Sequence, residues 1–183
     1  MEELGHLIKL RHEKLADLRE KGIAPYINRF KVDTAIKSLV QDFDGGSKEE
    51  LDEKDHTCIT AGRIMTRRKH GKTTFVNIQD STGKIQVFVN KNALGEEAYE
   101  LFGKFDIGDI IGINGRVSKT KTGELTLFAS KVTLLSKSLQ PLPEKWHGLK
   151  DVELRYRQRY VDLIVNPDVK KVFVLRSKII SAL

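Results

Sequence analysis

Thr73-Thr-Phe-Val-Asn-Ile-Gln79, Asp80-Ser-Thr-Gly83 and Lys84-Ile-Gln-Val-Phe-Val-Asn90 follow one another and decide the fold. The two outer stretches alternate β-branched residues with aromatic or amide residues, which is typical of strands that bury one face. The middle stretch is polar and ends in glycine, which predicts a turn. Together they predict a β-hairpin whose β-branched face fills a core.

Strand-like segments flank this hairpin on both sides. Ile59 to Arg68 precedes it, and Asp109 to Lys119 and Leu125 to Ser136 follow it. Leu94 to Phe105 has apolar residues at helical spacing,. The order β-β-β-α-β-β predicts a mainly β protein with flanking helices, a five-stranded Greek-key barrel of the OB-fold type.

The first of these strands is the least regular. Its alternation does not decide whether Arg63 and Arg68 lie on the same face. One extra residue in the strand, a β-bulge, would reverse the assignment, so both arrangements stay open.

Residues 1–56 predict a helical lead-in to the barrel of residues 57–140. Residues 2–21 carry leucines at helical spacing, and Asp33 is positioned to cap a second, short helix,. Ser47-Lys-Glu-Glu50 has the pattern of a capping box that opens a third helix,.

Residues 141–183 form a third segment. Pro141-Leu-Pro143 indicates a linker, and residues 151–164 predict a helix rich in arginine and tyrosine. Phe173 to Leu183 begins another helix without a stop signal,. We interpret this as a boundary within a longer protein.

The distribution of charge points to a polyanionic partner. Residues 57–140 hold 13 Lys and Arg against 7 Asp and Glu, although a solvated basic surface would give the same numbers,. No apolar run approaches the ~18 residues of a membrane span. The lone Cys58 excludes an internal disulfide and fits a cytoplasmic setting,.

The outer face of the predicted hairpin carries Phe75, Asn77, Gln86 and Phe88,. An exposed phenylalanine can stack on an unpaired base, at about 1–3 kcal/mol per base, and amides can bind base edges. Arg67 and Arg68 would add phosphate contacts beside them,. Alternatively, Phe75 and Phe88 lie under the flanking helices.

Five stretches resemble the lysyl-tRNA synthetases of class II, bacterial type. They are Ala61-Gly-Arg-Ile-Met-Thr-Arg-Arg68, Phe75-Val-Asn-Ile-Gln-Asp80, Lys119-Thr-Lys-Thr-Gly-Glu124, Pro141-Leu-Pro-Glu-Lys-Trp-His-Gly148 and Arg155-Tyr-Arg-Gln-Arg-Tyr-Val-Asp-Leu163. The last is the most specific, and the resemblance is strongest over residues 57–166.

The resemblance implies an anticodon-binding domain for lysine tRNA. Phe75 matches the family's stacking aromatic, Gln86 its base-reading amide, Arg68 a basic contact and Glu124 a carboxylate that approaches an anticodon base. The expected RNA-binding residues are therefore Arg67, Arg68, Phe75, Asn77, Gln86, Phe88 and Glu124. No catalytic or metal-binding residue is expected in this chain.

The full-length family enzyme is a homodimer that attaches lysine to tRNA with ATP and Mg²⁺. Phe173 to Ile180 resembles the start of the first class II motif, and the later motifs that hold ATP and lysine are absent. The resemblance thus implies that this chain alone is inactive and compatible with a monomer.

Two other functions remain as alternatives: a stand-alone OB module for single-stranded nucleic acid and a protein-interaction module. Gly71-Lys-Thr73 resembles the tail of a phosphate-binding P-loop. However, Thr66 stands where the motif needs glycine, and a strand follows instead of a helix,.

Overall fold

The computed structural model describes residues 2–143, 149 and 151–183. The chain divides into two compact units, one up to Pro141 and one from Leu142, and each is described by itself. Trp146 and His147, within the stretch Pro141 to Gly148 that carries part of the resemblance, lie outside the described residues. The division at residues 56 and 140 stays a prediction.

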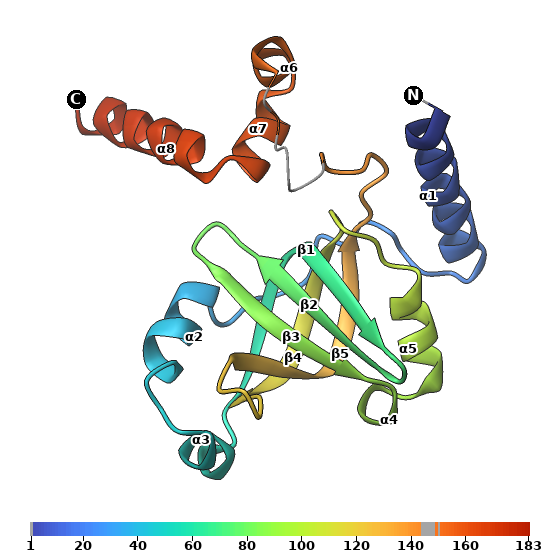
Figure 1. Cartoon of the computed structure of the whole chain (residues 1–183), viewed down its shortest axis with the longest axis vertical. Helices are drawn as coiled ribbons and strands as arrows, with labels where there is room; N and C mark the ends of the chain where they lie inside the picture. Colours follow the sequence, from blue (N-terminus) through green and yellow to red (C-terminus); the bar gives the residue numbers. More distant parts are fainter. Residues whose placement is uncertain (1, 144–148, 150) are drawn as a thin grey trace. The chain divides into compact units, whose positions relative to one another are not determined.

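Five strands close into a barrel in the first unit (Figure 1). They are β1 (Thr57–His70), β2 (Thr73–Gln79), β3 (Lys84–Asn90), β4 (Ile110–Lys119) and β5 (Leu125–Ser136). Neighbours follow the order β1-β2-β3-β5-β4; β3 and β5 are parallel and the other pairs antiparallel. With helices between β3 and β4, this is the predicted five-stranded OB fold,.

The β-branched faces of β2 and β3 fill the barrel, as their alternation predicts. Val76 lies opposite Val87, and Ile78 lies opposite Ile85. All four side chains are buried. The other strands contribute further buried apolar residues to this core: Ile64, Ile111, Ile113, Val117, Leu125, Leu127 and Ala129.

A bulge in β1 settles the arrangement that the sequence left open. The register against β2 shifts between Ile64 and Thr66. Before the shift Arg63 lies opposite Gln79, and after it Arg68 lies opposite Phe75, so both arginines belong to outward-facing rows,. Two residues separated by an odd number of positions would otherwise point to opposite faces.

Helix α2 (Ile36–Phe43) is capped by the turn between β2 and β3. The Asp80 carboxylate accepts the N–H of Ile36 at 3.1 Å, and the Thr82 hydroxyl accepts that of Lys37 at 3.1 Å. Burial raises the pKa of Asp80, but these backbone and hydroxyl hydrogen bonds outweigh it and hold the pKa below its usual value,.

Asp33 does not cap this helix, so that prediction is wrong. Ala35 holds the N-cap position. The Asp33 carboxylate instead accepts the N–H of Ile59 at 2.8 Å and so ties the lead-in to β1. The capping box at Ser47 and Glu50 is confirmed at the start of α3 (Lys48–Lys54).

The helix predicted over Leu94 to Phe105 is present as α5 (Glu96–Gly103), and a short helix that was not predicted, α4 (Lys91–Leu94), precedes it. Gly95 separates them with φ 86°, a backbone conformation that favours glycine,. Phe102 and the following Phe105 are buried in the core cluster.

Helix α1 (Glu2–Glu20) is attached to the barrel by buried charges. The Lys137 ammonium is fully buried and donates to Asp109 at 2.9 Å and to Asp106 at 2.6 Å. Arg11 of α1 donates to the carbonyls of Ile107 and Ser138 at 2.9 and 3.0 Å. This network connects the helix to the ends of the strands.

The second unit contains three helices among its described residues, α6 (Val152–Arg157), α7 (Arg159–Val165) and α8 (Pro167–Ala182). The helix predicted over residues 151–164 is therefore broken, at Gln158, where φ is −115° and ψ is 53°. No helix in the described part of the chain has the length and hydropathy needed to cross a membrane.

Lys137→Met should lower the free energy of unfolding by about 3–5 kcal/mol, because it leaves the buried Asp109 carboxylate without its cation,. Lys14→Met is the matched control, since Lys14 pairs with Asp106 but is partly exposed. Urea titration of both variants measures the difference. Equal losses in the two variants would contradict the importance of the buried pair.

Stability should fall as the pH drops below 3.8, the ordinary pKa of Asp106. Burial raises the pKa of Asp106, but Lys137 and Lys14 lower it further, so its folded-state pKa lies below the unfolded one. Its contribution is therefore present above the unfolded pKa and lost as pH falls through the folded pKa. Asp106→Asn should flatten this acid limb in urea titrations across pH; an unchanged slope would contradict the assignment.

Candidate nucleic-acid interface

A row of aromatic rings crosses the outer face of the barrel. Phe75 on β2 lies opposite Phe88 on β3, which lies opposite Phe128 on β5. Arg68 on β1 and Arg116 on β4 occupy the two ends of the same row. Because the strands bring these residues into register, residues 60 positions apart in the chain form one surface.

The rings contact one another as a ladder. The centroids of Phe75 and Phe88 are 4.9 Å apart, and those of Phe88 and Phe128 are 5.3 Å apart. The Arg116 guanidinium carbon lies 5.9 Å from the Phe128 centroid. All three rings are half-buried and line a pocket of about 650 Å³. The alternative that Phe75 and Phe88 lie hidden under the flanking helices is therefore wrong.

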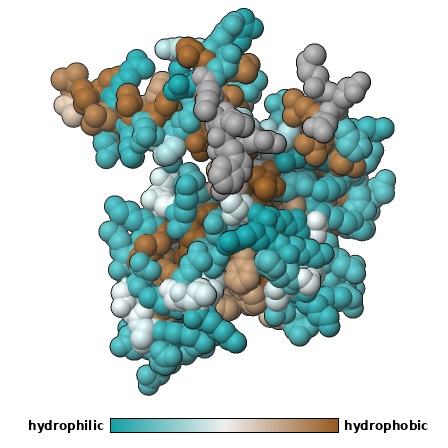
Figure 2. All heavy atoms as spheres, in the orientation of Figure 1, coloured by the Kyte–Doolittle hydropathy of each residue, from teal (hydrophilic) through white to brown (hydrophobic). Residues whose placement is uncertain are grey.

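The surface around the rings is hydrophilic. Figure 2 shows light-brown apolar atoms in the middle of the barrel face with teal residues around them. Five cationic side chains and two carboxylates line the pocket: Lys48, Arg68, Arg116, Lys119, Lys121, Asp52 and Glu124. The balance of charge favours an anionic ligand, and the rings favour one that also has a flat apolar part.

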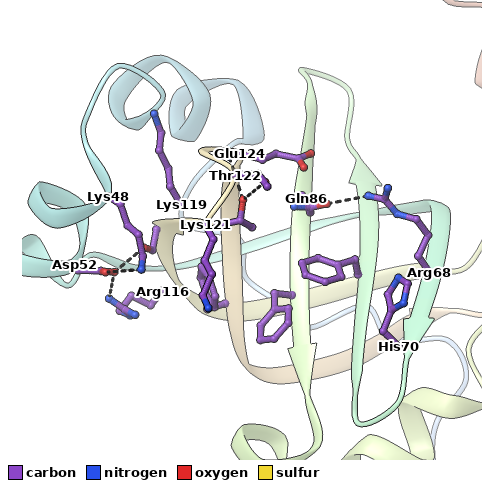
Figure 3. A pocket seen from close by; sticks show the side chains of 15 residues that line it. Lys48, Asp52, Arg68, His70, Gln86, Arg116, Lys119, Lys121, Thr122 and Glu124 are labelled. Carbon is purple, nitrogen blue, oxygen red and sulfur yellow. Dashed lines mark hydrogen bonds and ion pairs between the residues drawn. The ribbon is translucent and has the colours of Figure 1, made fainter.

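A polar row runs beside the aromatic row. Asn77 lies opposite Gln86, and Gln86 lies opposite Thr126. Arg68 donates to the Gln86 Oε1 at 3.1 Å (Figure 3). The Gln86 Nε2 donates to the Thr126 hydroxyl at 3.0 Å. Gln86 is 5 % exposed. The expectation of an amide open to solvent is therefore corrected: Gln86 lies in the pocket wall within a hydrogen-bond chain.

The β4–β5 hairpin forms one rim of the pocket. The Thr120 hydroxyl accepts the Glu124 N–H at 3.1 Å, and Gly123 has φ 83°. The exposed Glu124 carboxylate forms no hydrogen bond or ion pair with any described residue, so it is available to a ligand. Lys119 holds the hairpin against the end of α2 by donating to the Asp44 carbonyl at 2.7 Å.

Helix α3 and β4 supply a wall that the sequence did not predict. Asp52 accepts from Arg116 at 2.8 Å and from the Ser118 hydroxyl at 2.6 Å (Figure 3). The Ser118 hydrogen bond, followed by Arg116, lowers the pKa of Asp52 despite its partial burial. The pair holds the Arg116 guanidinium over the edge of the aromatic row.

Phe128 was not predicted as a site residue, although the alternation of β5 indicates that it faces outward. Leu125, Leu127 and Ala129 are buried on one face of β5, so the alternation puts Phe128 on the other,. The same argument that selected Phe75 and Phe88 therefore applies to it. Arg116 and Asp52 gave no such signal, because only the folded barrel brings α3 next to β4.

The structure separates Arg67 from the other expected residues. Its guanidinium donates to the carbonyls of Gly103 and Phe105 and lies 5.0 Å from the centroid of Phe102. Burial lowers the pKa of Arg67. Arg67 thus holds the end of α5 against the barrel. Asn77 shares the outer face with Gln86 but does not line the pocket, whereas Arg68, Phe75, Gln86, Phe88 and Glu124 all do.

Among the described residues, no group of three His, Cys, Asp or Glu side chains could hold a metal ion. Cys58 is buried, and burial raises the pKa of its thiol to about 11. The residues that line the pocket can stack on a flat ring, form hydrogen bonds and attract an anion.

Comparison with known proteins supports a nucleic-acid interface. Residues 59–135 match the family described as an OB-fold nucleic acid binding domain. Over 99 % of its length the chain is 56 % identical to the lysine–tRNA ligase of Pelotomaculum thermopropionicum, of which it covers 34 %. It is 53 % and 51 % identical, over 100 % of its length, to those of Carboxydothermus hydrogenoformans and Halalkalibacterium halodurans, of which it covers 36 % and 37 %.

Phe75→Ala should lower the free energy of unfolding less than Ile78→Ala does. Ile78 lies on the same strand, β2, but on its opposite face. Ile78 is fully buried, and its truncation should cost about 2–5 kcal/mol,. Phe75 is half-buried and has one ring contact with Phe88. Thermal unfolding of the two variants compares them, and a loss in Phe75→Ala as large as that in Ile78→Ala would place this ring in the core.

Proposed function

Because this chain belongs to the lysyl-tRNA synthetase family, as a relative of its N-terminal region, we propose that its barrel binds the anticodon loop of lysine tRNA. The observation that carries the proposal is the row of three phenylalanine rings between Arg68 and Arg116, with the Gln86 amide beside it. An RNA loop offers the matching groups: unpaired bases and phosphates.

The proposed contacts follow from the chemistry of each side chain. Phe75 and Phe88, with Phe128, stack on splayed bases. Gln86 and Glu124 bind base edges, and Arg68 contacts either a base or its phosphate. We add Arg116 as a cation at the far end of the row. Asn77 lies where it can extend the polar row, and Arg67 supports the barrel.

The activity of the whole relatives is a separate proposal, because the chain spans only about a third of their length. We propose that the barrel serves a longer cytoplasmic protein that attaches lysine to tRNA with ATP and Mg²⁺ and works as a homodimer. We expect the 183-residue chain by itself not to activate lysine, and ATP–pyrophosphate exchange by the purified chain would contradict this.

A general OB module for single-stranded nucleic acid is the second candidate. The basic and aromatic lining of the pocket also suits sequence-tolerant binding,. The two candidates differ in the role of Gln86 and Glu124. Binding of the lysine tRNA anticodon requires these side chains to distinguish one base from another, whereas a general module for single-stranded nucleic acid does not.

The chain should bind lysine tRNA more tightly than a tRNA of unrelated anticodon or single-stranded DNA at the same salt concentration. Phe75→Ala should weaken binding of lysine tRNA by about 5- to 150-fold, through the loss of about 1–3 kcal/mol of stacking. Fluorescence anisotropy at fixed salt measures both effects.

Phe43→Ala is the matched control, because this half-buried ring contacts His56 and does not line the pocket. Its tRNA affinity should match that of the unmodified chain. Equal affinity for all three nucleic acids would favour the general module, and no binding would reject both candidates.

A further inference from the structure

Three hydrogen bonds form one directed chain in the pocket wall. The Arg68 Nη2 donates to the Gln86 Oε1 at 3.1 Å, the Gln86 Nε2 donates to the Thr126 Oγ1 at 3.0 Å, and the Thr126 hydroxyl donates to the Glu124 carbonyl at 3.0 Å. The Gln86 amide and the Thr126 hydroxyl each accept once from the group before them and donate once to the group after them. The chain starts at an exposed arginine and ends on the backbone of the hairpin.

The chemistry of the two ends leaves only one orientation for the Gln86 amide. A guanidinium has donors and no acceptor, so the amide atom that faces Arg68 is the oxygen. The NH₂ group then faces Thr126, whose hydroxyl accepts from it and donates its own proton to the carbonyl. A flipped amide would oppose donor to donor at Arg68.

The two partners of Gln86 differ in how firmly they are held. Arg68 is exposed at the end of β1, whereas Thr126 is fully buried in β5. The Glu124 carbonyl that accepts from Thr126 also accepts the N–H of Thr120 at 3.0 Å, which closes the hairpin. Thr126 is therefore the buried anchor of the amide, and Arg68 is the solvent-exposed one.

We propose that Thr126 is a positioning residue that sets the base preference of the pocket by holding the Gln86 amide with one N–H free for a base. The proposal rests on the proposed function of the barrel as an RNA-binding surface. Thr126 Oγ1 takes one of the two N–H groups of the amide. Gln86 lines the pocket, so its second N–H is the donor that this side chain offers to a ligand,.

The polar groups then suit uracil better than cytosine. The Gln86 amide offers an N–H donor, and the unpaired Glu124 carboxylate offers an acceptor. Uracil presents acceptor, donor and acceptor along its pairing edge, whereas cytosine presents an amino donor where uracil has O4. When Thr126 holds the amide, the amino group of cytosine faces the Gln86 N–H, and two donors cannot form a hydrogen bond. Without Thr126 the amide can rotate, so that its oxygen accepts a hydrogen bond from the cytosine amino group.

Two RNA hairpins with the same stem and loops of seven uridines or seven cytidines provide the test. The unmodified chain should prefer the uridine loop by about 5- to 150-fold. Thr126→Val, which removes the hydroxyl at nearly constant shape, should bring this ratio close to one. Thr126→Ser should restore it, because it returns the hydroxyl.

Two further measurements keep the role of Thr126 separate from folding and from affinity. In a ¹⁵N NMR spectrum, one proton of the Gln86 side-chain amide should be protected from exchange in the unmodified chain and in Thr126→Ser, and exposed in Thr126→Val. Arg68→Ala should weaken binding of both hairpins by similar factors and keep their ratio, because Thr126 still holds the amide.

A uridine preference that survives in a folded Thr126→Val protein would overturn the inference while leaving lysine tRNA binding intact. Loss of the uridine preference in Arg68→Ala, together with its retention in Thr126→Val, would also overturn the inference. Arg68 would then be the residue that fixes the orientation of the Gln86 amide. If the unmodified chain fails to prefer lysine tRNA over other tRNAs, the proposed function itself fails.

Discussion

Closure of the barrel is the constraint on which the rest of this structure depends. In a closed sheet every strand has two neighbours, so each side chain either fills the interior or lies outside. The interior takes the β-branched residues of β2 and β3 and leaves no room for their phenylalanines. Phe75, Phe88 and Phe128 are thus excluded together, and cross-strand register aligns them as one ladder. The row of aromatic rings on the outer face therefore follows from the packing of the core.

The polar part of the site is organised before any ligand arrives. Gln86 has partners at both ends of its amide, and Asp52 holds Arg116 beside Phe128. The Arg116–Asp52 pair is about one third exposed, and such pairs contribute little to stability,. Its effect is on position, since it limits where the guanidinium can lie relative to the ring. Side chains that are already ordered lose less entropy when a loop binds.

The local pattern predicted much of this fold and part of the site. The ranges of β2, β3 and β5 agree with the alternation, because strand period and glycine-containing turns are local properties. The cap of α2 could not be predicted in this way, since Asp80 lies 44 residues from Ile36. Gly95 lies within the range predicted as helix, but its positive φ ends α4, and α5 begins only at Glu96. Arg67 and Arg68 look equivalent in sequence. After the bulge in β1, however, strand alternation places them on opposite faces of the barrel.

The sequence by itself determined the order of strands and helices in the barrel, the buried and outward faces of the β2–β3 hairpin, and the excess of basic residues in the middle segment. It did so because alternation and charge are carried by neighbouring residues. Only the tertiary structure decided that Phe128 extends the aromatic row, that Asp52 holds Arg116, and that Thr126 fixes the Gln86 amide. Each of these is a contact across strands or between a helix and the barrel. Its geometry exists only after closure has set the register.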